Sequence, residues 1–350
     1  MKAIELKSIG KLELVEKEKP RPKKDEVLVK IKACGICGSD LPRVYQNGTY
    51  HFPTVIGHEF AGKVVELGEN VDQKLLNQRV AVFPILPCFH CRSCLSGDYA
   101  QCDNYRYFGS RNDGGFEEYL AVPVFNLVPL TDNISYEEGA MIEPATVAQH
   151  AIQKSGLKLG DNVVVYGAGP IGIMVARWAK LAGANHIALF DIDNDAINFA
   201  QKLGFTNTFF NDGQNNLENI QQAFGGELAD IVVEATGNTH SFNNCVQSIT
   251  KFGTVVLLGN PHSDMTLKRA TYDQLMRKEG KIISVYNDVY KRYPTDEWST
   301  TRNALDSKEL KVHDLITQRV AIDEVTDLFE HIHNKKIFSC KSMMVIKHKG

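Results

Sequence analysis

The sequence predicts an α/β protein with two domains, a β-rich N-terminal domain and a doubly wound parallel sheet. Three observations predict it: the length of the chain, a change of pattern near residue 160, and a glycine-rich turn between a strand and a helix. A length of 350 residues suits two domains on one polypeptide. Hydrophobic residues make up 43% of the chain, so each domain can bury a core of its own.

The first part of the chain, up to about residue 150, alternates short β-like runs with glycine and proline turns. Runs at 27–32, 62–66 and 79–83 are typical of strands. This pattern predicts a β domain with many loops.

From about residue 160 the pattern becomes strand, helix, strand, helix. Apolar strands that alternate with helices indicate a parallel sheet covered by helices on both faces. The predicted strands are 163–166, 186–190, 231–234, 255–258 and 281–285, and the predicted helices are 171–181 and 196–203.

The tail after about residue 286 is irregular before a predicted helix over 324–333 and a strand over 342–346. We expect this tail to return to the first domain. The expected domains are therefore 1–153 rejoined by 287–350, and 154–286.

Charge and hydropathy exclude several classes of protein. The formal net charge of −3 gives no electrostatic footprint for nucleic acid or an anionic membrane. The N-terminus has no apolar run of signal-peptide length, and no stretch approaches the roughly 18 apolar residues of a membrane span. We expect a cytoplasmic protein with a small-molecule partner.

The glycine-rich turn predicts a dinucleotide site. It has the Gly-x-Gly-x-x-Gly spacing, follows a predicted strand and opens a predicted helix. Gly167 permits the turn, Gly169 lets the backbone approach a pyrophosphate, and Gly172 lets the helix pack on the sheet. The helix N-terminus would face the phosphates, and Pro170 suits its first turn. The predicted cofactor-binding residues are Gly167, Gly169, Pro170, Ile171, Gly172 and Asp191.

Asp191 lies nineteen residues after Gly172, at the end of the second strand of the pattern. A carboxylate there accepts hydrogen bonds from the adenosine ribose. The next residues, Ile192, Asp193 and Asn194, supply no cation for a 2′-phosphate, so NAD is predicted over NADP. The alternative is an ordinary glycine turn and a surface aspartate.

Eight cysteines are present, and six of them fall between Cys34 and Cys102. In a reducing compartment such clustering favours metal over disulfides. Four of them are spaced by two, two and seven intervening residues. Thiolates at this spacing can close a tetrahedron around a structural zinc, although iron–sulfur ligation stays open. The four are Cys88, Cys91, Cys94 and Cys102.

A second set of metal-ligand types is more dispersed: Cys37, His58, Glu59 and Glu143. Taken singly, each has an ordinary explanation as a buried thiol, a core or surface histidine, or an acid beside a helix. Cys34 keeps that ordinary explanation.

The whole constellation resembles the zinc-containing medium-chain dehydrogenase family. The stretch from Gly57 to Gly62, GHEFAG, is similar to the family's zinc signature, and the four-cysteine lobe and the glycine turn follow in the family's order. The resemblance covers essentially the whole chain. It implies a GroES-like catalytic domain, a Rossmann domain and a final segment that rejoins the first domain.

Within the family the chain is most similar to the polyol dehydrogenases, including those that oxidise galactitol 1-phosphate. Glu143 occupies the region where the alcohol dehydrogenases carry a second cysteine ligand. The resemblance implies a catalytic zinc held by Cys37, His58 and Glu59, with Glu143 bound directly or through water, and Ser39 as proton relay. The matching stretches are 37–43, 86–89, 109–111, 113–116 and 142–144.

The resemblance implies NAD-linked oxidation of a secondary alcohol, with galactitol 1-phosphate converted to tagatose 6-phosphate and two zinc ions per chain. Arg43 and Arg111 border the implied substrate pocket and could bind phosphate in a bidentate fork; the alternative is a surface charge or subunit contact. Other interpretations are a sorbitol- or xylitol-type dehydrogenase acting on free polyols, and a non-catalytic dinucleotide sensor. The family suggests a homodimer or homotetramer.

Overall fold

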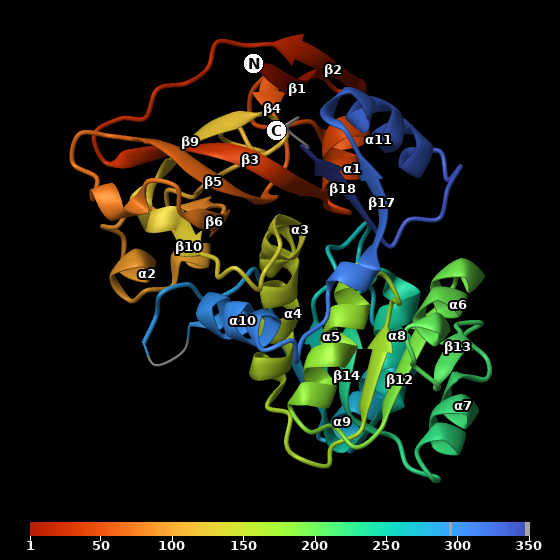
Figure 1. Cartoon of the computed structure of the whole chain (residues 1–350). Helices are drawn as coiled ribbons and strands as arrows, with labels where there is room; N and C mark the ends of the chain where they lie inside the picture. Colours follow the sequence, from red (N-terminus) through yellow and green to blue (C-terminus); the bar gives the residue numbers. More distant parts are fainter. Residues whose placement is uncertain (294–295, 347–350) are drawn as a thin grey trace. The chain divides into compact units, whose positions relative to one another are not determined.

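The structure, a computed structural model, describes residues 1–293 and 296–346 of the chain. It contains two compact units: Met1–Pro144 together with Val289–Gly350, and Ala145–Asp288 (Figure 1). The first is β-rich and the second has a parallel sheet covered by helices, so the predicted fold class is confirmed. Within the described residues, no helix has both the length and the apolar character that a membrane span requires.

The first unit is organised around one seven-stranded sheet, in the order β10-β6-β5-β3-β18-β17, with β9 also paired to β3. The last of these strands along the chain, β18, pairs antiparallel with β3, so the tail of the chain extends the N-terminal sheet. The strands are β3 (Glu26–Ile36), β5 (Glu59–Leu67), β6 (Arg79–Val82), β9 (Tyr119–Pro123), β10 (Leu127–Pro129), β17 (Ile316–Val320) and β18 (Lys341–Val345).

Two smaller sheets and several short helices complete this unit. The sheets have the orders β2-β1-β4 and β7-β8. Their strands are β1 (Lys2–Ser8), β2 (Lys11–Glu16), β4 (Thr54–Val55), β7 (Ile85–Leu86) and β8 (Arg106–Tyr107). The helices are α1 (Asp40–Pro42), α2 (Arg92–Leu95), α3 (Tyr136–Ala140), α10 (Glu297–Asp306) and α11 (Val325–His333). Helix α4 (Ile142–Ser155) begins in this unit and continues into the next.

The second unit has a six-stranded, all-parallel sheet in the order β13-β12-β11-β14-β15-β16. All four side chains of the central strand β11 are buried, which is typical of a strand covered on both faces. The order reverses between β11 and β14, and nucleotides bind at such switch points. The elements are β11 (Val163–Tyr166), β12 (Ile187–Asp191), β13 (Thr208–Phe210), β14 (Ala229–Glu234), β15 (Ile249–Leu257), β16 (Lys281–Ser284), α5 (Pro170–Leu181), α6 (Asn194–Lys202), α7 (Asn216–Ala223), α8 (Thr239–Ser248) and α9 (Arg269–Arg277).

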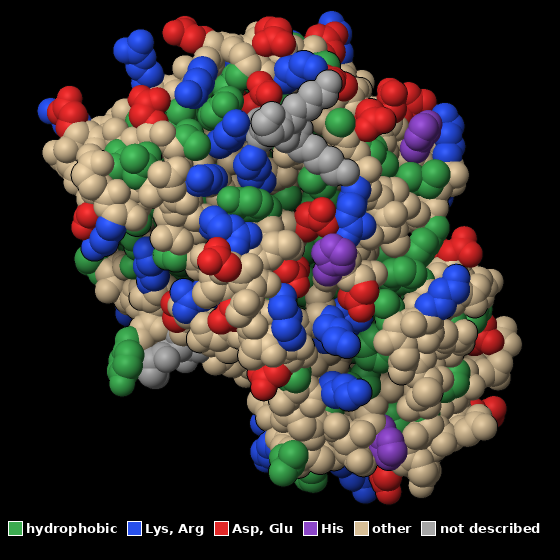
Figure 2. Space-filling model, viewed as in Figure 1, with side chains coloured by type: hydrophobic (Ala, Val, Ile, Leu, Met, Phe, Trp, Pro, Cys, Tyr) green, Lys and Arg blue, Asp and Glu red, His purple; other side chains and the backbone are tan. Residues whose placement is uncertain are grey.

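The surface mixes charges of both signs. On the face drawn in Figure 2, acidic and basic side chains are interspersed, in keeping with the small net charge of −3. Any anionic ligand of this face would therefore be recognised by particular cations rather than by a broad field.

Candidate active site and metal sites

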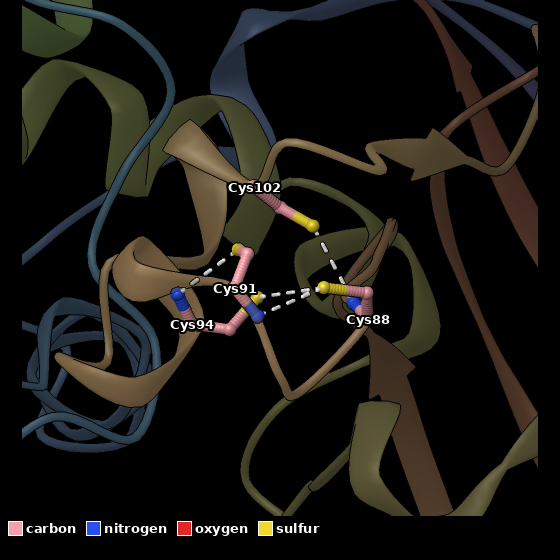
Figure 3. Close-up of side chains that lie close together, drawn as sticks. All are labelled: Cys88, Cys91, Cys94 and Cys102. Atoms are coloured by element: carbon pink, nitrogen blue, oxygen red, sulfur yellow. Dashed lines mark hydrogen bonds between the residues drawn. The ribbon is translucent and has the colours of Figure 1, made fainter.

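Four thiols gather in the segment between β7 and β8. Cys91 precedes α2, Cys94 lies within it, and Cys88 and Cys102 flank it. All four sulfurs lie within 4.8 Å of one another, and Figure 3 shows them turned toward a common centre. None of these thiols is in a disulfide.

Backbone N–H groups of this four-cysteine lobe donate to three of its four sulfurs. The N–H groups of Cys88, Cys91 and Cys94 donate to the sulfurs of Cys102, Cys88 and Cys91 at 3.4, 3.4 and 3.5 Å. Partial burial acts to raise the pKa of the Cys88 thiol, but the N–H groups of His90 and Cys91 lower it to about 6. The pKa shifts differ in direction, because burial raises the pKa of the Cys94 and Cys102 thiols whereas that of Cys88 is lowered. Four such sulfur donors fit a closed tetrahedral zinc site.

A second group of ligand atoms forms where β3 ends and β5 begins. Strand pairing places Gly35 opposite Glu59, which brings Cys37 beside His58. The ligand atoms of Cys37, His58 and Glu59 all lie within 4.8 Å of one another, and both His58 and Glu59 are buried. Sulfur, nitrogen and oxygen donors from three residues fit a zinc site that keeps an open position.

Asp40 lies directly behind this group and is fully buried. One carboxylate oxygen accepts a hydrogen bond from the Cys37 N–H at 3.0 Å. The other lies 3.4 Å from His58 Nδ1 and accepts from Arg43 Nη1 at 2.5 Å. Burial acts to raise the pKa of Asp40, but His58 and Arg43 hold it below its ordinary value. A carboxylate behind a ligating histidine fixes the orientation of the imidazole.

Lys341 is the partner of Glu59. Its Nζ donates to both carboxylate oxygens of Glu59 at 2.7 Å and to the carbonyl of Ile36 at 3.2 Å. Only 2% of the Lys341 side chain and none of the Glu59 side chain is exposed. Burial acts to lower the pKa of Lys341, but the charge of Glu59 raises it. The fold therefore favours the charged form of Lys341.

Glu143 lies in the first turn of α4 and is buried. Within the described residues, it is not a member of the group of mutually close ligand atoms. Its Oε1 accepts a hydrogen bond from the Tyr107 hydroxyl at 3.1 Å. Burial raises the pKa of this carboxyl to about 7.

Ser39 is half-buried, two residues after Cys37. Its hydroxyl makes no capping bond at the start of α1 and no other hydrogen bond with the described part of the chain. No local backbone bond therefore occupies the Ser39 hydroxyl.

The two predicted substrate arginines differ in their surroundings. Arg43 is ion-paired with Asp40. The guanidinium of Arg111 lies 4.0 Å from the ring centroid of Tyr50 and 5.0 Å from that of Tyr105, and its Nη1 donates to the Tyr105 carbonyl at 2.5 Å. The buried Nε of Arg111 has no hydrogen-bond partner among the described residues.

The loop that carries Arg111 is attached to the residue before His58. The N–H of Gly115 donates to the carbonyl of Gly57 at 2.8 Å. A Cβ at Gly114 would lie 2.0 Å from that carbonyl oxygen, and one at Gly109 would lie 2.8 Å from the Gly57 nitrogen. These backbones approach too closely for any side chain.

The glycine turn joins β11 to α5 in the second unit. Gly167 has a φ of +108°, and a Cβ at Gly172 would lie 1.8 Å from the Gly167 carbonyl oxygen. Gly169 caps α5, with Pro170 and Ile171 as its first residues, and a Cβ at Gly169 would meet nothing within 4 Å. The start of α5 thus offers an open backbone surface of the kind that binds phosphates.

Asp191 ends β12, and its side chain holds the same turn. One carboxylate oxygen accepts from the Ala168 N–H at 2.6 Å and the other from the Asp193 N–H at 2.9 Å. Each oxygen can accept a second hydrogen bond, so a ribose remains a compatible ligand.

Comparisons with known proteins identify the family. The profile of the alcohol dehydrogenase GroES-like domain matches residues 23–132, and that of the zinc-binding dehydrogenases matches residues 170–302. Over 321 residues the chain is 34% identical to galactitol 1-phosphate 5-dehydrogenase of Escherichia coli strain K12, which covers 91% of this chain and 92% of the relative. The chain belongs to the zinc-binding medium-chain dehydrogenases. This dehydrogenase is also 31% identical to L-threonine 3-dehydrogenase of Vibrio parahaemolyticus, over 93% of this chain and 96% of the relative.

The solved structures agree with this family. The crystal structure of galactitol-1-phosphate dehydrogenase from Escherichia coli matches the dehydrogenase with a TM-score of 0.91 and 31% identity, over 99% of this chain and 100% of that chain. The predicted resemblance to this family is confirmed.

Three residues of the site were not singled out from the sequence: Asp40, Lys341 and Tyr107. Asp40 stands in the stretch from Cys37 to Arg43 that carried the resemblance, so its position was a usable signal. Lys341 is separated from Glu59 by 282 residues, and Tyr107 from Glu143 by 36. No local pattern connects residues so far apart.

Proposed function

We propose that this dehydrogenase uses zinc and NAD to oxidise a secondary alcohol of a polyol phosphate, with galactitol 1-phosphate converted to tagatose 6-phosphate. The observation that supports this proposal most directly is the cluster of Cys37, His58 and Glu59, whose ligand atoms lie within 4.8 Å of one another. A sensor that only binds a dinucleotide would not need this open set of donors. The second zinc of the proposal belongs to the four-cysteine lobe.

The bound groups would carry the electronic part of the reaction. Zinc would polarise the substrate hydroxyl as a Lewis acid, and NAD would accept the hydride. Residues of the chain would hold these groups. Cys37, His58, Glu59 and Glu143 would hold the zinc. The turn from Gly167 to Gly172 would hold NAD together with Asp191.

Ser39 is the proposed proton relay. Its hydroxyl can accept one hydrogen bond while it donates another. It follows the zinc ligand Cys37 by two residues and is only half-buried. The Oγ of Ser39 can therefore accept the proton of the substrate hydroxyl and pass it toward solvent.

Arg111 is the proposed phosphate-binding residue. The rings of Tyr50 and Tyr105 and the bond to the Tyr105 carbonyl hold its guanidinium. A fixed guanidinium with unused donors can bind a phosphate at little entropic cost. The phosphate prediction for Arg43 has weaker support, because its Nη1 already donates to the buried Asp40.

The substrate class is tested by initial rates on paired galactitol 1-phosphate and free galactitol, with sorbitol, xylitol and L-threonine in the same panel. Charge-assisted hydrogen bonds contribute about 1.5–3 kcal/mol each. We therefore expect Arg111→Ala to raise KM for the phosphorylated substrate by roughly tenfold to a hundredfold. The rate on free galactitol should stay unchanged.

Arg106→Ala is the matched control, because Arg106 is an exposed arginine on β8, close to Arg111 in the sequence. Equal losses on free and phosphorylated polyols in Arg111→Ala would rule out phosphate binding by this residue. A wild type that prefers free polyol would favour the sorbitol-type alternative. NADH formation that persists after removal of all metal would overturn the zinc mechanism.

The remaining parts of the proposal concern the state of the protein in the cell. We propose a cytoplasmic homodimer or homotetramer, supported by the resemblance to the polyol dehydrogenases. Sedimentation velocity of the purified chain distinguishes these forms from a monomer.

A further inference from the structure

Tyr107 connects parts of the first unit that carry the proposed chemistry. Its hydroxyl donates to Oε1 of Glu143 at 3.1 Å. Its ring lies 5.5 Å from the ring of His58, at an interplanar angle of 53°. Its backbone carbonyl accepts the N–H groups of Arg111 and Asn112, both at 3.0 Å.

The position of this side chain is set by its packing. The ring of Tyr107 stacks on that of Tyr105 with centroids 5.6 Å apart and an angle of 14°, and Tyr107 is only 7% exposed. The hydroxyl is therefore presented to Glu143 from a fixed direction. Glu143 is itself buried at the start of α4, so both partners of the bond are held by the fold.

We infer that Tyr107 is a positioning residue, whose hydroxyl holds one carboxyl oxygen of Glu143 and leaves the other as the single oxygen offered to the catalytic metal or to its water. The inference rests on the proposed zinc site. A carboxylate held at one oxygen keeps a fixed orientation, so Glu143 presents its other oxygen in one direction. Groups behind the ligands commonly control metal affinity in this way.

Tyr107→Phe is the decisive variant, because it removes the hydroxyl and keeps the ring against Tyr105 and His58. We expect its affinity for the catalytic metal to fall by roughly tenfold to a hundredfold, the usual effect of losing a partner behind a ligand. The second readout is the visible spectrum of the full-length protein with cobalt(II) in place of zinc. Its ligand-field bands should shift because the oxygen donors rearrange, whereas the thiolate bands of the four-cysteine lobe should not.

Glu143→Ala supplies the mechanistic control. If Tyr107 acts through Glu143, Tyr107→Phe adds no further loss of metal affinity in the Glu143→Ala background. Tyr119→Phe, a substitution of the same kind on β9, should leave both affinity and spectrum as in the wild type.

The outcomes separate this inference from the proposed function. A Tyr107→Phe protein with the wild-type spectrum and affinity would overturn the inference, as would an equal loss in the presence and absence of Glu143. A wild type that binds cobalt(II) only at the four cysteines would instead overturn the proposed catalytic zinc site.

Discussion

The charged side chains around the proposed zinc site are buried together with their partners. Glu59 forms an ion pair with Lys341, and Asp40 contacts both Arg43 and His58. Removing a charge from water costs several kcal/mol, which a close partner of opposite sign offsets. Each of these side chains therefore depends on its partner to remain in place.

Lys341→Met should destabilise the dehydrogenase by about 3–5 kcal/mol, because it leaves the buried carboxylate of Glu59 without a counter-charge. Urea unfolding of the wild type and the variant measures the difference. Adding Glu59→Gln should recover part of the lost stability, since the unpaired charge is then gone. A loss under 1 kcal/mol in Lys341→Met would mean that Glu59 takes up a proton or another partner.

Asp191 holds the glycine turn, and its substitution should affect both that turn and the proposed NAD site. Its carboxylate holds the N–H groups of Ala168 and Asp193, and we propose that it also binds the NAD ribose. Asp191→Ala should raise KM for NAD by roughly tenfold to a hundredfold through lost charge-assisted bonds. The substitution also removes a support of the glycine turn, which would bind either cofactor. KM for NADP should therefore fall by a smaller factor than KM for NAD rises.

Steady-state kinetics with both cofactors tests this prediction. The wild type should favour NAD, since Asp191 would repel a 2′-phosphate. Equal use of NAD and NADP by the wild type would show that Asp191 does not face the ribose.

At the level of elements, the sequence predicted best where burial leaves a clear pattern. The strand expected at 163–166 coincides with β11, because burial on both faces makes the run continuously apolar. Helix α8, Thr239–Ser248, was not predicted, because only three of its ten residues are apolar: Phe242, Cys245 and Val246. Strand β13, Thr208–Phe210, was not predicted, because three residues are too few to show a period. Tertiary packing decides such elements.

The residues of the candidate site also fall into two groups, those that could be predicted from the sequence and those that could not. Candidate ligands that share a short motif, such as the four cysteines or His58 with Glu59, were predicted from spacing and resemblance. The bonds from Lys341 to Glu59 and from Tyr107 to Glu143 exist only because the folded chain brings distant segments together. The sequence alone does not show how distant segments pair, so these contacts could not be predicted from it.

Glu117 offers a pH-dependent test of how β1 is attached to its neighbours. Its backbone forms an isolated antiparallel β-bridge with Ala3 of β1, and the residue is 3% exposed. Burial, followed by the charge of Asp113, raises its pKa well above the ordinary value, although Lys17 opposes the rise. The fold thus favours the protonated form, so its contribution to stability is full below the unfolded pKa of about 4.3 and declines as the pH rises through the folded pKa.

Glu117→Gln should remove this decline, because the amide does not ionise. Urea unfolding at a series of pH values from about 5 to 8 compares the slopes of the unfolding free energy against pH. The exposed Glu66→Gln on β5 is the control and should retain the wild-type slope. Identical slopes in wild type and Glu117→Gln would show that Glu117 is ionised in the fold at all these pH values.

For the whole molecule, each unit has its own hydrophobic core. Both candidate metal sites belong to the first unit, but they should differ in what their loss does. Cys94→Ser should release the structural metal and raise hydrogen exchange throughout the lobe, because a structural zinc contributes folding energy directly. Cys37→Ser should lose the other metal and the activity while exchange in the lobe stays slow.

Elemental analysis with hydrogen-exchange mass spectrometry makes this comparison. The wild type should contain two zinc ions per chain and each variant one. Exchange in the second unit should be the same in all three proteins. A wild type that is fully active without metal, or a Cys94→Ser protein whose lobe exchanges as in the wild type, would contradict the prediction.

The contact between Gly57 and the loop from Gly109 to Gly115 has a practical consequence for engineering a new specificity. Random substitution of that loop would include many variants in which a side chain at 109 or 114 pushes on the peptide that precedes His58. Such variants would lose the proposed catalytic zinc, so their preference for a substrate could not be measured. A library confined to Tyr50 and Arg111, with both glycines retained, separates the choice of substrate from the retention of zinc.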